Sequence, residues 1–155
     1  MIISGGQTGV DRGALDAALA AGVRCGGYCP AGRLAEDGRI PRRYPLIETA
    51  GPEYRERTFR NVSASDGTLI ICPGLPRSGT ALTHAACGSL DRPCLVVDAA
   101  REDVRHAADR AAGFVVAGHI QRLNVAGPRA SEWPAGHGYA MTVVSDLLSR
   151  QPESP

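Results

Sequence analysis

The first sixteen residues, Met1-Ile-Ile-Ser-Gly-Gly-Gln-Thr-Gly-Val-Asp-Arg-Gly-Ala-Leu-Asp16, decide the fold. A short apolar run ends in a glycine-rich segment, and an amphipathic segment follows directly, which predicts a strand, a tight loop and a helix. Such a loop points backbone N–H groups and a helix N-terminus at one place, a combination that favours an anion, most often a phosphate. The residues expected to bind this anion are Gly5, Gly6, Gln7, Thr8 and Gly9.

The composition is that of a soluble globular protein. The chain has 155 residues, 43% of them hydrophobic and 21% charged, with a formal net charge of +1. This length suits one domain with a sizeable core, and the balanced charge provides no field that would attract a nucleic acid. No run approaches the roughly 18 apolar residues that a membrane helix needs. We therefore expect neither a nucleic-acid nor a membrane partner.

All 17 basic residues are arginine, and the sequence contains no lysine. A P-loop lysine and a Schiff-base lysine are therefore excluded. Cationic contacts to a ligand must come from arginine, whose planar guanidinium prefers oxyanions that accept two hydrogen bonds. Codon usage is the alternative explanation for this bias.

The odd number of cysteines, five, favours a reduced cytoplasmic protein over a disulfide-linked one. Cys25 and Cys29 are spaced like half of a metal site, but no second pair matches them, so we expect no protein-bound zinc. The N-terminus lacks the basic and apolar regions of a signal peptide, which also favours a cytoplasmic location.

Apolar runs alternate with helical patterns along the rest of the chain, as in α/β proteins with a parallel sheet. Strands are predicted over residues 1–4, 23–29, 68–72, 94–97 and 123–126. Helices are predicted over residues 11–22, 53–63, 81–87, 101–112 and 139–149. Segment 30–52 is expected to be an ordered but irregular loop, and 113–121 is ambiguous between a helix end and a strand. We expect a single Rossmann-like, doubly wound domain with a mainly parallel sheet over residues 1–150, and a frayed tail at 151–155.

A second glycine loop, Pro73-Gly-Leu-Pro-Arg-Ser-Gly-Thr80, follows the strand predicted at 68–72. If this strand neighbours the first strand, both loops face one crevice at the carboxyl edge of the sheet, where doubly wound proteins bind ligands. The alternative is that the glycines only allow tight turns. The candidate anion-binding residues of this loop are Gly74, Arg77, Ser78, Gly79 and Thr80.

A third candidate follows the last predicted strand, in Leu123-Asn-Val-Ala-Gly-Pro-Arg129. Asn124 offers an amide to the edge of a heterocycle, and Arg129 offers a guanidinium to an oxyanion. A plain turn with a solvated arginine is the alternative.

Six further side chains are candidates for ligand contact: Asp11, Arg33, Glu36, Asp37, Thr83 and His84. Asp11 follows Thr8 by three residues, which also suits a capping box. Glu36 and Asp37 would form a solvated turn or bind ligand hydroxyl groups. His84 would contact the ligand or remain solvated on its helix.

Five motifs occur in order along the chain: Ile3-Ser-Gly-Gly-Gln-Thr-Gly-Val-Asp-Arg-Gly-Ala-Leu-Asp16, Cys29-Pro-Ala-Gly-Arg-Leu-Ala-Glu-Asp-Gly38, Ile40-Pro-Arg-Arg-Tyr-Pro-Leu46, Ser78-Gly-Thr-Ala-Leu-Thr83 and Leu123-Asn-Val-Ala-Gly-Pro-Arg129. Together they resemble the family named "putative molybdenum carrier", over roughly residues 2–148. That family is similar to the LOG phosphoribohydrolases, also called lysine-decarboxylase-like proteins. The resemblance implies a Rossmann-like fold and a phosphorylated ligand such as the molybdenum cofactor (molybdopterin). We also expect a homo-oligomer, either a dimer or a tetramer.

One position departs from the related enzymes. LOG-type proteins carry a Pro-Gly-Gly-x-Gly-Thr-x-x-Glu motif with a catalytic glutamate, and the resemblance aligns that glutamate with Thr83. Threonine cannot act as a carboxylate base. We therefore expect a binding or carrier protein for a phosphorylated heterocycle rather than an enzyme. A nucleotide phosphoribohydrolase or N-glycosidase is the alternative.

Overall fold

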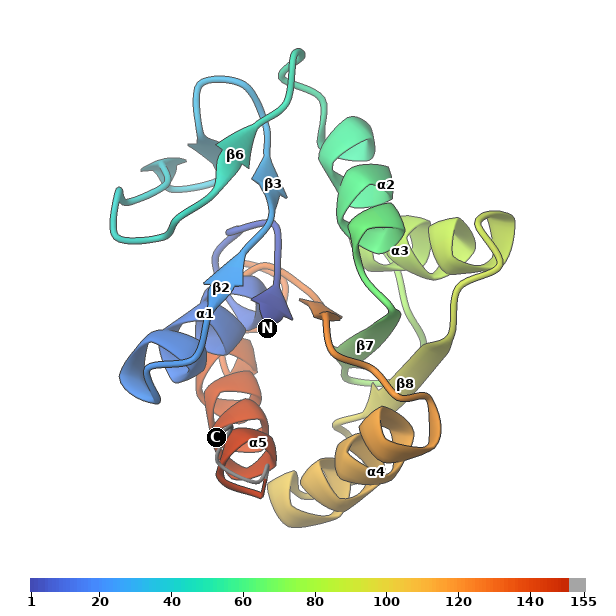
Figure 1. The fold of residues 1–155 in the computed structure, drawn as a ribbon. Coiled ribbons are helices and arrows are strands. Elements are labelled where there is room, and N and C mark those ends of the chain that lie inside the picture. Colours follow the sequence, from blue (N-terminus) through green and yellow to red (C-terminus); the bar gives the residue numbers. More distant parts are fainter. Residues whose placement is uncertain (151–155) are drawn as a thin grey trace.

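The computed structural model describes residues 1–150, and the tail predicted at 151–155 lies outside them. A five-stranded sheet, parallel throughout, forms the centre of the molecule (Figure 1). Its strands are β1 (Ile2–Ile3), β2 (Cys25–Gly26), β7 (Gly67–Cys72), β8 (Cys94–Asp98) and β9 (Leu123–Ala126). All six residues of β7 are buried, as expected for a parallel strand covered on both faces.

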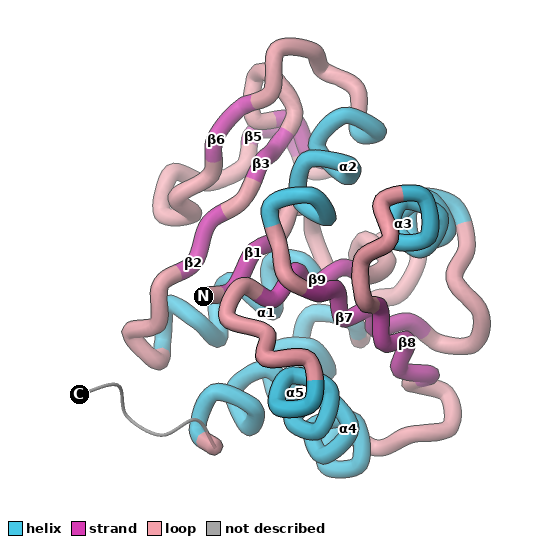
Figure 2. Tube along the Cα trace, turned by 45° about the vertical axis from the view of Figure 1, so that its right-hand side comes forward, coloured by secondary structure: helices cyan, strands magenta, loops and turns pink. Residues whose placement is uncertain are grey.

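Helices cover both faces of the sheet, which confirms the Rossmann-like α/β fold (Figure 2). The helices are α1 (Val10–Ala20), α2 (Tyr54–Ala64), α3 (Ser78–Ser89), α4 (Val104–Ala117) and α5 (Gly136–Ser149). Helix α5 packs between α1 and α4 on one face, and α2 packs with α3 on the other. The main core lies between the sheet and α1, α4 and α5, where these helices bury mostly alanine and valine.

The strand order is β2-β1-β9-β7-β8. The strands before the two glycine loops, β1 and β7, are therefore not neighbours, because β9 lies between them. Asn124 of β9 pairs with Ile3 on one side and with Thr68 on the other. If the chain is numbered from β7 onward and its ends are joined, the order becomes 2-1-3-4-5, which is that of flavodoxin-like proteins. The sheet thus has a common doubly wound topology with displaced chain ends.

The region predicted as one strand over 23–29 is divided between two sheets. β2 joins the central sheet, whereas β3 (Tyr28–Cys29) pairs with β6 (Ile47–Glu48) in a separate ladder. Gly27 stands at the break with φ of 135°, and a Cβ there would lie 2.2 Å from the Ser4 carbonyl oxygen. Only glycine permits this approach.

Residues 30–52, which we call the strap, are ordered, as expected, but contain short strands that were not predicted. β4 (Leu34–Ala35) and β5 (Gly38–Arg39) form a small hairpin, and β6 ends the strap. Ile40 and Tyr44 are buried against Leu15 and Cys29. The strap therefore has its own small core beside α1.

Several helix boundaries differ from the prediction. Helix α1 has Gly9 as its N-cap with no side-chain capping bond, so the predicted capping box of Thr8 and Asp11 is wrong. Helix α4 starts after Asp103, whose carboxylate accepts the His106 N–H at 2.8 Å, and it extends to Ala117 into the ambiguous segment. Helix α5 begins three residues earlier than predicted.

Candidate functional site

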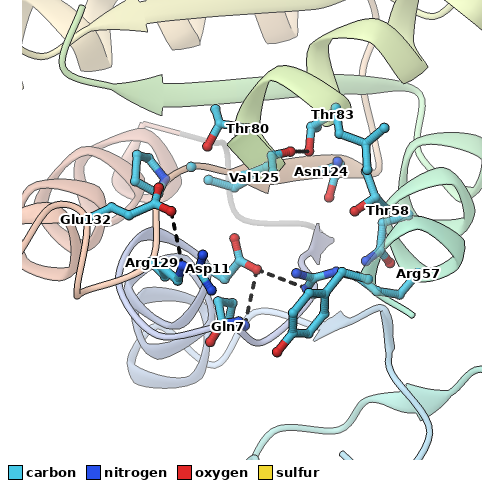
Figure 3. Close-up of a pocket in the computed structure, with 18 residues that line it drawn as sticks. Gln7, Asp11, Arg57, Thr58, Thr80, Thr83, Asn124, Val125, Arg129 and Glu132 are labelled. Carbon is cyan, nitrogen blue, oxygen red and sulfur yellow. Dashed lines mark hydrogen bonds and ion pairs between the residues drawn. The ribbon is translucent and has the colours of Figure 1, made fainter. Parts of the chain in front are cut away.

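A cleft open to solvent lies at the carboxyl ends of β1, β7 and β9 (Figure 3). In the doubly wound order it lies at the point where the strand order reverses, between β7 and β9, which is where such sheets bind ligands. The cleft is therefore the candidate site.

Eight of the residues proposed from the sequence line this cleft: Gly5, Gln7, Asp11, Gly79, Thr80, Thr83, Asn124 and Arg129. Both glycine loops and the end of β9 thus meet in one place, although β1 and β7 are not adjacent. The two loops and the end of β9 meet because all strands of the sheet are parallel, so their carboxyl ends lie at one edge of the sheet.

Sequence reasoning missed the wall that α2 provides. Tyr54, Arg57, Thr58 and Asn61 line the cleft from one face of this helix. Their spacing of i, i+3, i+4 and i+7 puts polar side chains on a single stripe, a signal that the sequence did contain. The other cleft residues not predicted are Leu82, Val125, Ala126, Gly127, Pro128 and Glu132.

Asp11 and Arg57 form a partly buried ion pair in the cleft. Arg57 Nη1 lies 3.4 Å from Asp11 Oδ2, and the side chains are 13% and 7% exposed. Asp11 also accepts the Gln7 N–H at 3.2 Å. Burial raises the pKa of Asp11 above its usual range, and Arg57 and the Gln7 N–H oppose this shift. Among the residues described, the Nε of Arg57 is the buried side-chain atom without a hydrogen-bond partner.

The first glycine loop packs tightly against other parts of the protein. A Cβ on Gly5 would lie 1.8 Å from Arg57 Nη1, one on Gly6 would lie 2.4 Å from Leu46 Cδ1, and one on Gly9 would lie 2.5 Å from the Pro128 carbonyl oxygen. The missing side chains therefore leave room for the Arg57 guanidinium at Gly5, for the strap at Gly6 and for the segment after β9 at Gly9.

Several backbone donors of this loop are used within the protein. The Gln7 N–H binds Asp11, the Thr8 N–H binds Gln7 Oε1 at 3.0 Å, and the Val10 N–H binds the Pro128 carbonyl at 3.4 Å. These three N–H groups are therefore not available to a phosphate without rearrangement. Gly6, Thr8 and Gly9 do not line the cleft.

The second glycine loop contributes the first turn of α3. Gly79 and Thr80 line the cleft, and a Cβ on Gly79 would have no atom within 4 Å. Ser78, just before them, has φ of 49°, an unusual backbone conformation for a residue with a side chain. Arg77 and Ser78 are exposed outside the cleft. Gly74 is also outside it, and its N–H donates to the Asp98 carboxylate at 2.7 Å.

The remaining walls of the cleft come from α3, from β9 and from the segment after β9. The Thr83 hydroxyl donates to the Gly79 carbonyl at 3.2 Å, and Thr83 lines the cleft. The Asn124 amide donates to the Thr68 hydroxyl at 3.3 Å. Arg129 donates to Glu132 at 3.1 Å at the cleft rim. Hydroxyl, amide and guanidinium groups therefore surround the partly buried ion pair.

The candidate residues of the strap form hydrogen bonds to other residues of the protein and do not line the cleft. Arg33 donates to the carbonyls of Ile40, Pro41, Tyr44 and Leu46. Glu36 accepts from Ser131 and Thr8, and these hydrogen bonds lower the pKa of its carboxyl group. Asp37 accepts two hydrogen bonds from Arg12, which lower its pKa in the same way.

His84 stands exposed on α3 outside the cleft. Within residues 1–150 there is no cluster of three or more His, Cys, Asp or Glu side chains that could hold a metal ion. Across the same residues, no helix is both long and apolar enough to span a membrane.

The parallel sheet, the helices on both of its faces and the cleft at its carboxyl edge define a Rossmann-like protein. The family described as "Circularly permutated YpsA SLOG family" matches residues 2–148, and the chain belongs to it. The displaced chain ends of the sheet agree with a permuted topology.

A solved structure also resembles this chain. It is the crystal structure of a "putative molybdenum carrier protein" from Syntrophus aciditrophicus SB, 45% identical, covering 95% of this chain and 93% of that one with a TM-score of 0.93. The resemblance drawn from the sequence motifs is thereby confirmed. A comparison with curated proteins finds no match.

Proposed function

We propose that this protein binds a phosphorylated heterocycle in the cleft and carries it rather than converting it. The observation that carries the proposal is Arg57, a partly buried arginine in the cleft whose one ion pair within residues 1–150 is a single long contact and whose buried Nε has no hydrogen-bond partner there. An under-satisfied guanidinium is suited to an oxyanion because it can donate two parallel hydrogen bonds.

The remaining walls suit the rest of such a ligand. Asn124 offers an amide to a heterocycle edge, while Thr80 and Thr83 offer hydroxyl groups to a linker or sugar. The molybdenum cofactor, a phosphorylated pterin, fits this donor set as cargo. The similar protein named as a molybdenum carrier supports this choice of ligand. In this proposal Arg57 binds the phosphate and Asn124 contacts the ring.

A specific observation keeps the phosphoribohydrolase alternative open to test. Asp11 and Glu132 bring two carboxyl groups into the cleft, although Thr83 replaces the LOG-type glutamate. Glycosidic cleavage builds positive charge on the ribose and needs a carboxylate to stabilise it or to activate water. Asp11 is already committed to Arg57 and to the Gln7 N–H, which favours the carrier function.

Binding is tested by titrating GMP and AMP into the protein by calorimetry, with guanosine and adenosine as matched controls without phosphate. Native mass spectrometry of protein purified without added ligand tests for a retained cargo. We expect each nucleotide to bind at least about tenfold more tightly than its nucleoside, because hydrogen bonds between charged groups contribute roughly 1.5–3 kcal/mol. Equal affinity for nucleotide and nucleoside would contradict a phosphate site.

Catalysis is tested by measuring base release from the same nucleotides, with Thr83→Glu made alongside the wild type. We expect the wild type to release no base at ordinary enzymatic rates, since general acid–base groups alone contribute about 10²–10⁴-fold. Wild-type turnover of about 1 s⁻¹ or more would overturn the carrier function in favour of the enzyme.

A further inference from the structure

The ion pair between Asp11 and Arg57 is weakly bonded. It rests on one nitrogen–oxygen contact of 3.4 Å, although a carboxylate and a guanidinium can form two shorter bonds. The Nε of Arg57 is buried without a partner, and the guanidinium lies against the backbone at Gly5. The arginine is thus held in place while part of its hydrogen-bonding capacity stays unused.

The surroundings of Asp11 determine what happens when an anion arrives. Its charge is faced by Arg57 from α2, by Arg12 from α1, and by the Gln7 N–H and the Ser4 hydroxyl from the segment after β1. Arg12 is itself bound to Asp37 by two hydrogen bonds. Arg129 and Glu132 line the same cleft from the segment after β9 and are bound to each other. Arg57 is therefore the main cation that compensates Asp11.

An oxyanion that binds Arg57 would remove this compensation. Two like charges at hydrogen-bonding distance from one guanidinium repel each other strongly in a buried site. Asp11, with 7% of its side chain exposed, cannot turn into water without leaving the cleft wall. The favourable response is protonation, which removes one of the two charges and leaves a carboxyl group able to donate a hydrogen bond to the bound oxyanion.

We propose that Asp11 is a resident counter-ion of Arg57 which a tetrahedral oxyanion displaces, so that ligand binding is coupled to the uptake of one proton by Asp11. The inference rests on the proposed function and extends it, because it assigns the oxyanion subsite and makes the release of cargo sensitive to pH. The proton comes from solvent and is bound at Asp11 Oδ1 or Oδ2, with no covalent change in the ligand.

The sign of the pH dependence follows from linkage. Burial already raises the pKa of Asp11 in the free protein, and a bound anion raises it further. Between the two values, each bound anion takes up one proton and affinity falls about tenfold per pH unit as the pH rises. Below the pKa of the free protein, Asp11 is already protonated and affinity no longer depends on this group.

The experiment uses inorganic sulfate and molybdate, because these dianions do not titrate between pH 6 and 9 and leave Asp11 as the source of any proton linkage. The titration of Asp11 in the free protein is first followed by carboxyl ¹³C NMR. Calorimetry is then performed one pH unit above that midpoint, in two buffers of different ionisation enthalpy. The difference between the two heats gives the number of protons taken up per anion.

We expect uptake of close to one proton in the wild type. Asp11→Asn should bind sulfate about tenfold more tightly at that pH and without proton uptake, since the competing charge is gone. Arg57→Gln should abolish binding. Asp109→Asn is the control, because it removes a carboxylate that is paired with an arginine, Arg150, but lies outside the cleft, and it should behave like the wild type. Thermal melting checks that each variant is folded.

Three outcomes would overturn the inference. Binding of sulfate or molybdate by the wild type without proton uptake would show that Asp11 stays charged beside the anion, while the proposed function survives. An Asp11 that is already protonated at pH 8 in the free protein would show that it is no counter-ion. Absence of sulfate and molybdate binding at any pH would remove the oxyanion site, and the proposed function would fall with it.

Discussion

The two glycine loops look alike in sequence but differ in what their glycines contact. In the loop between β1 and α1, the space beside Gly5, Gly6 and Gly9 is filled by other parts of the protein. In the loop between β7 and α3, the space beside Gly74 and Gly79 is open. The glycines of the first loop allow other parts of the protein to pack around the cleft, whereas the first turn of α3 forms part of the cleft surface.

A glycine pattern in the sequence indicates that another group comes close to the backbone at that position, but it does not identify that group. A missing Cβ can admit a ligand, a neighbouring backbone or an arginine side chain. Here the first loop admits Arg57, which brings to the cleft the cation that the loop's own sequence lacks. Substitutions that add one methyl group to each loop can therefore separate the two uses.

The largest expected effect is loss of stability on Gly9→Ala. Gly9 has φ of 81°, and the new Cβ would lie 2.5 Å from the Pro128 carbonyl oxygen. We expect a loss of about 2–5 kcal/mol in the free energy of unfolding, combining a left-handed conformation at roughly 1–2 kcal/mol with overpacking at roughly 1–3 kcal/mol. Urea denaturation measures it.

Gly79→Ala is the matched variant in the second loop. Its methyl group would meet no atom within 4 Å, and alanine favours the helix by about 1 kcal/mol over glycine. Unfolding free energy should stay equal or rise slightly. Similar destabilisation by both substitutions would erase the distinction between the loops.

An intermediate effect is expected for Gly5→Ala. Gly5 is not among the residues with positive φ, so its backbone accepts alanine, but the Cβ would lie 1.8 Å from Arg57 Nη1. The guanidinium must move, and we expect sulfate affinity to fall at least about tenfold, with about 1–2 kcal/mol lost in stability. Calorimetry and urea denaturation measure the two effects.

Gly138→Ala on α5 is the control for Gly5→Ala, because its Cβ would be in open space. This variant should bind sulfate like the wild type. If Gly5→Ala also bound sulfate with wild-type affinity, Gly5 would have no role in positioning Arg57.

The smallest expected effect concerns Glu36, which joins the first loop to the strap through Thr8. Hydrogen bonds from Ser131 and Thr8 lower the pKa of this carboxyl in the folded protein. A lowered pKa contributes stability above the unfolded value of about 4.3, and this contribution is lost as the pH falls through the folded value.

At pH 7 the wild type should therefore have a higher urea midpoint of unfolding than Glu36→Gln. The two midpoints should converge as the pH falls from about 5 to below 4. Sulfate affinity should not change, because Glu36 does not line the cleft. A large loss of sulfate affinity in this variant would bring the strap into the binding site.

Local signals were sufficient where a segment's structure depends on its own residues. The apolar run of β7 and the pattern of α1 predicted a strand and a helix because burial and periodicity are local properties. The helix predicted over residues 11–22 ends at Ala20, and Gly22, just beyond the C-cap, has φ of 67°, a conformation that glycine adopts readily after a helix. The strap was harder, because its two-residue strands depend on partners far along the chain.

Sequence by itself determined the α/β class, the parallel sheet and eight of the residues that line the cleft, because hydrophobic periodicity and glycine loops mark strand ends. Only the tertiary structure decided which donors face the cleft. Arg57 stands 46 positions after Asp11, and β9 lies between β1 and β7, so their meeting depends on long-range packing. The same packing uses loop N–H groups internally and directs Arg33, Glu36 and Asp37 to other parts of the protein. A side chain's partner is set by the free energy of the whole fold, which no local pattern contains.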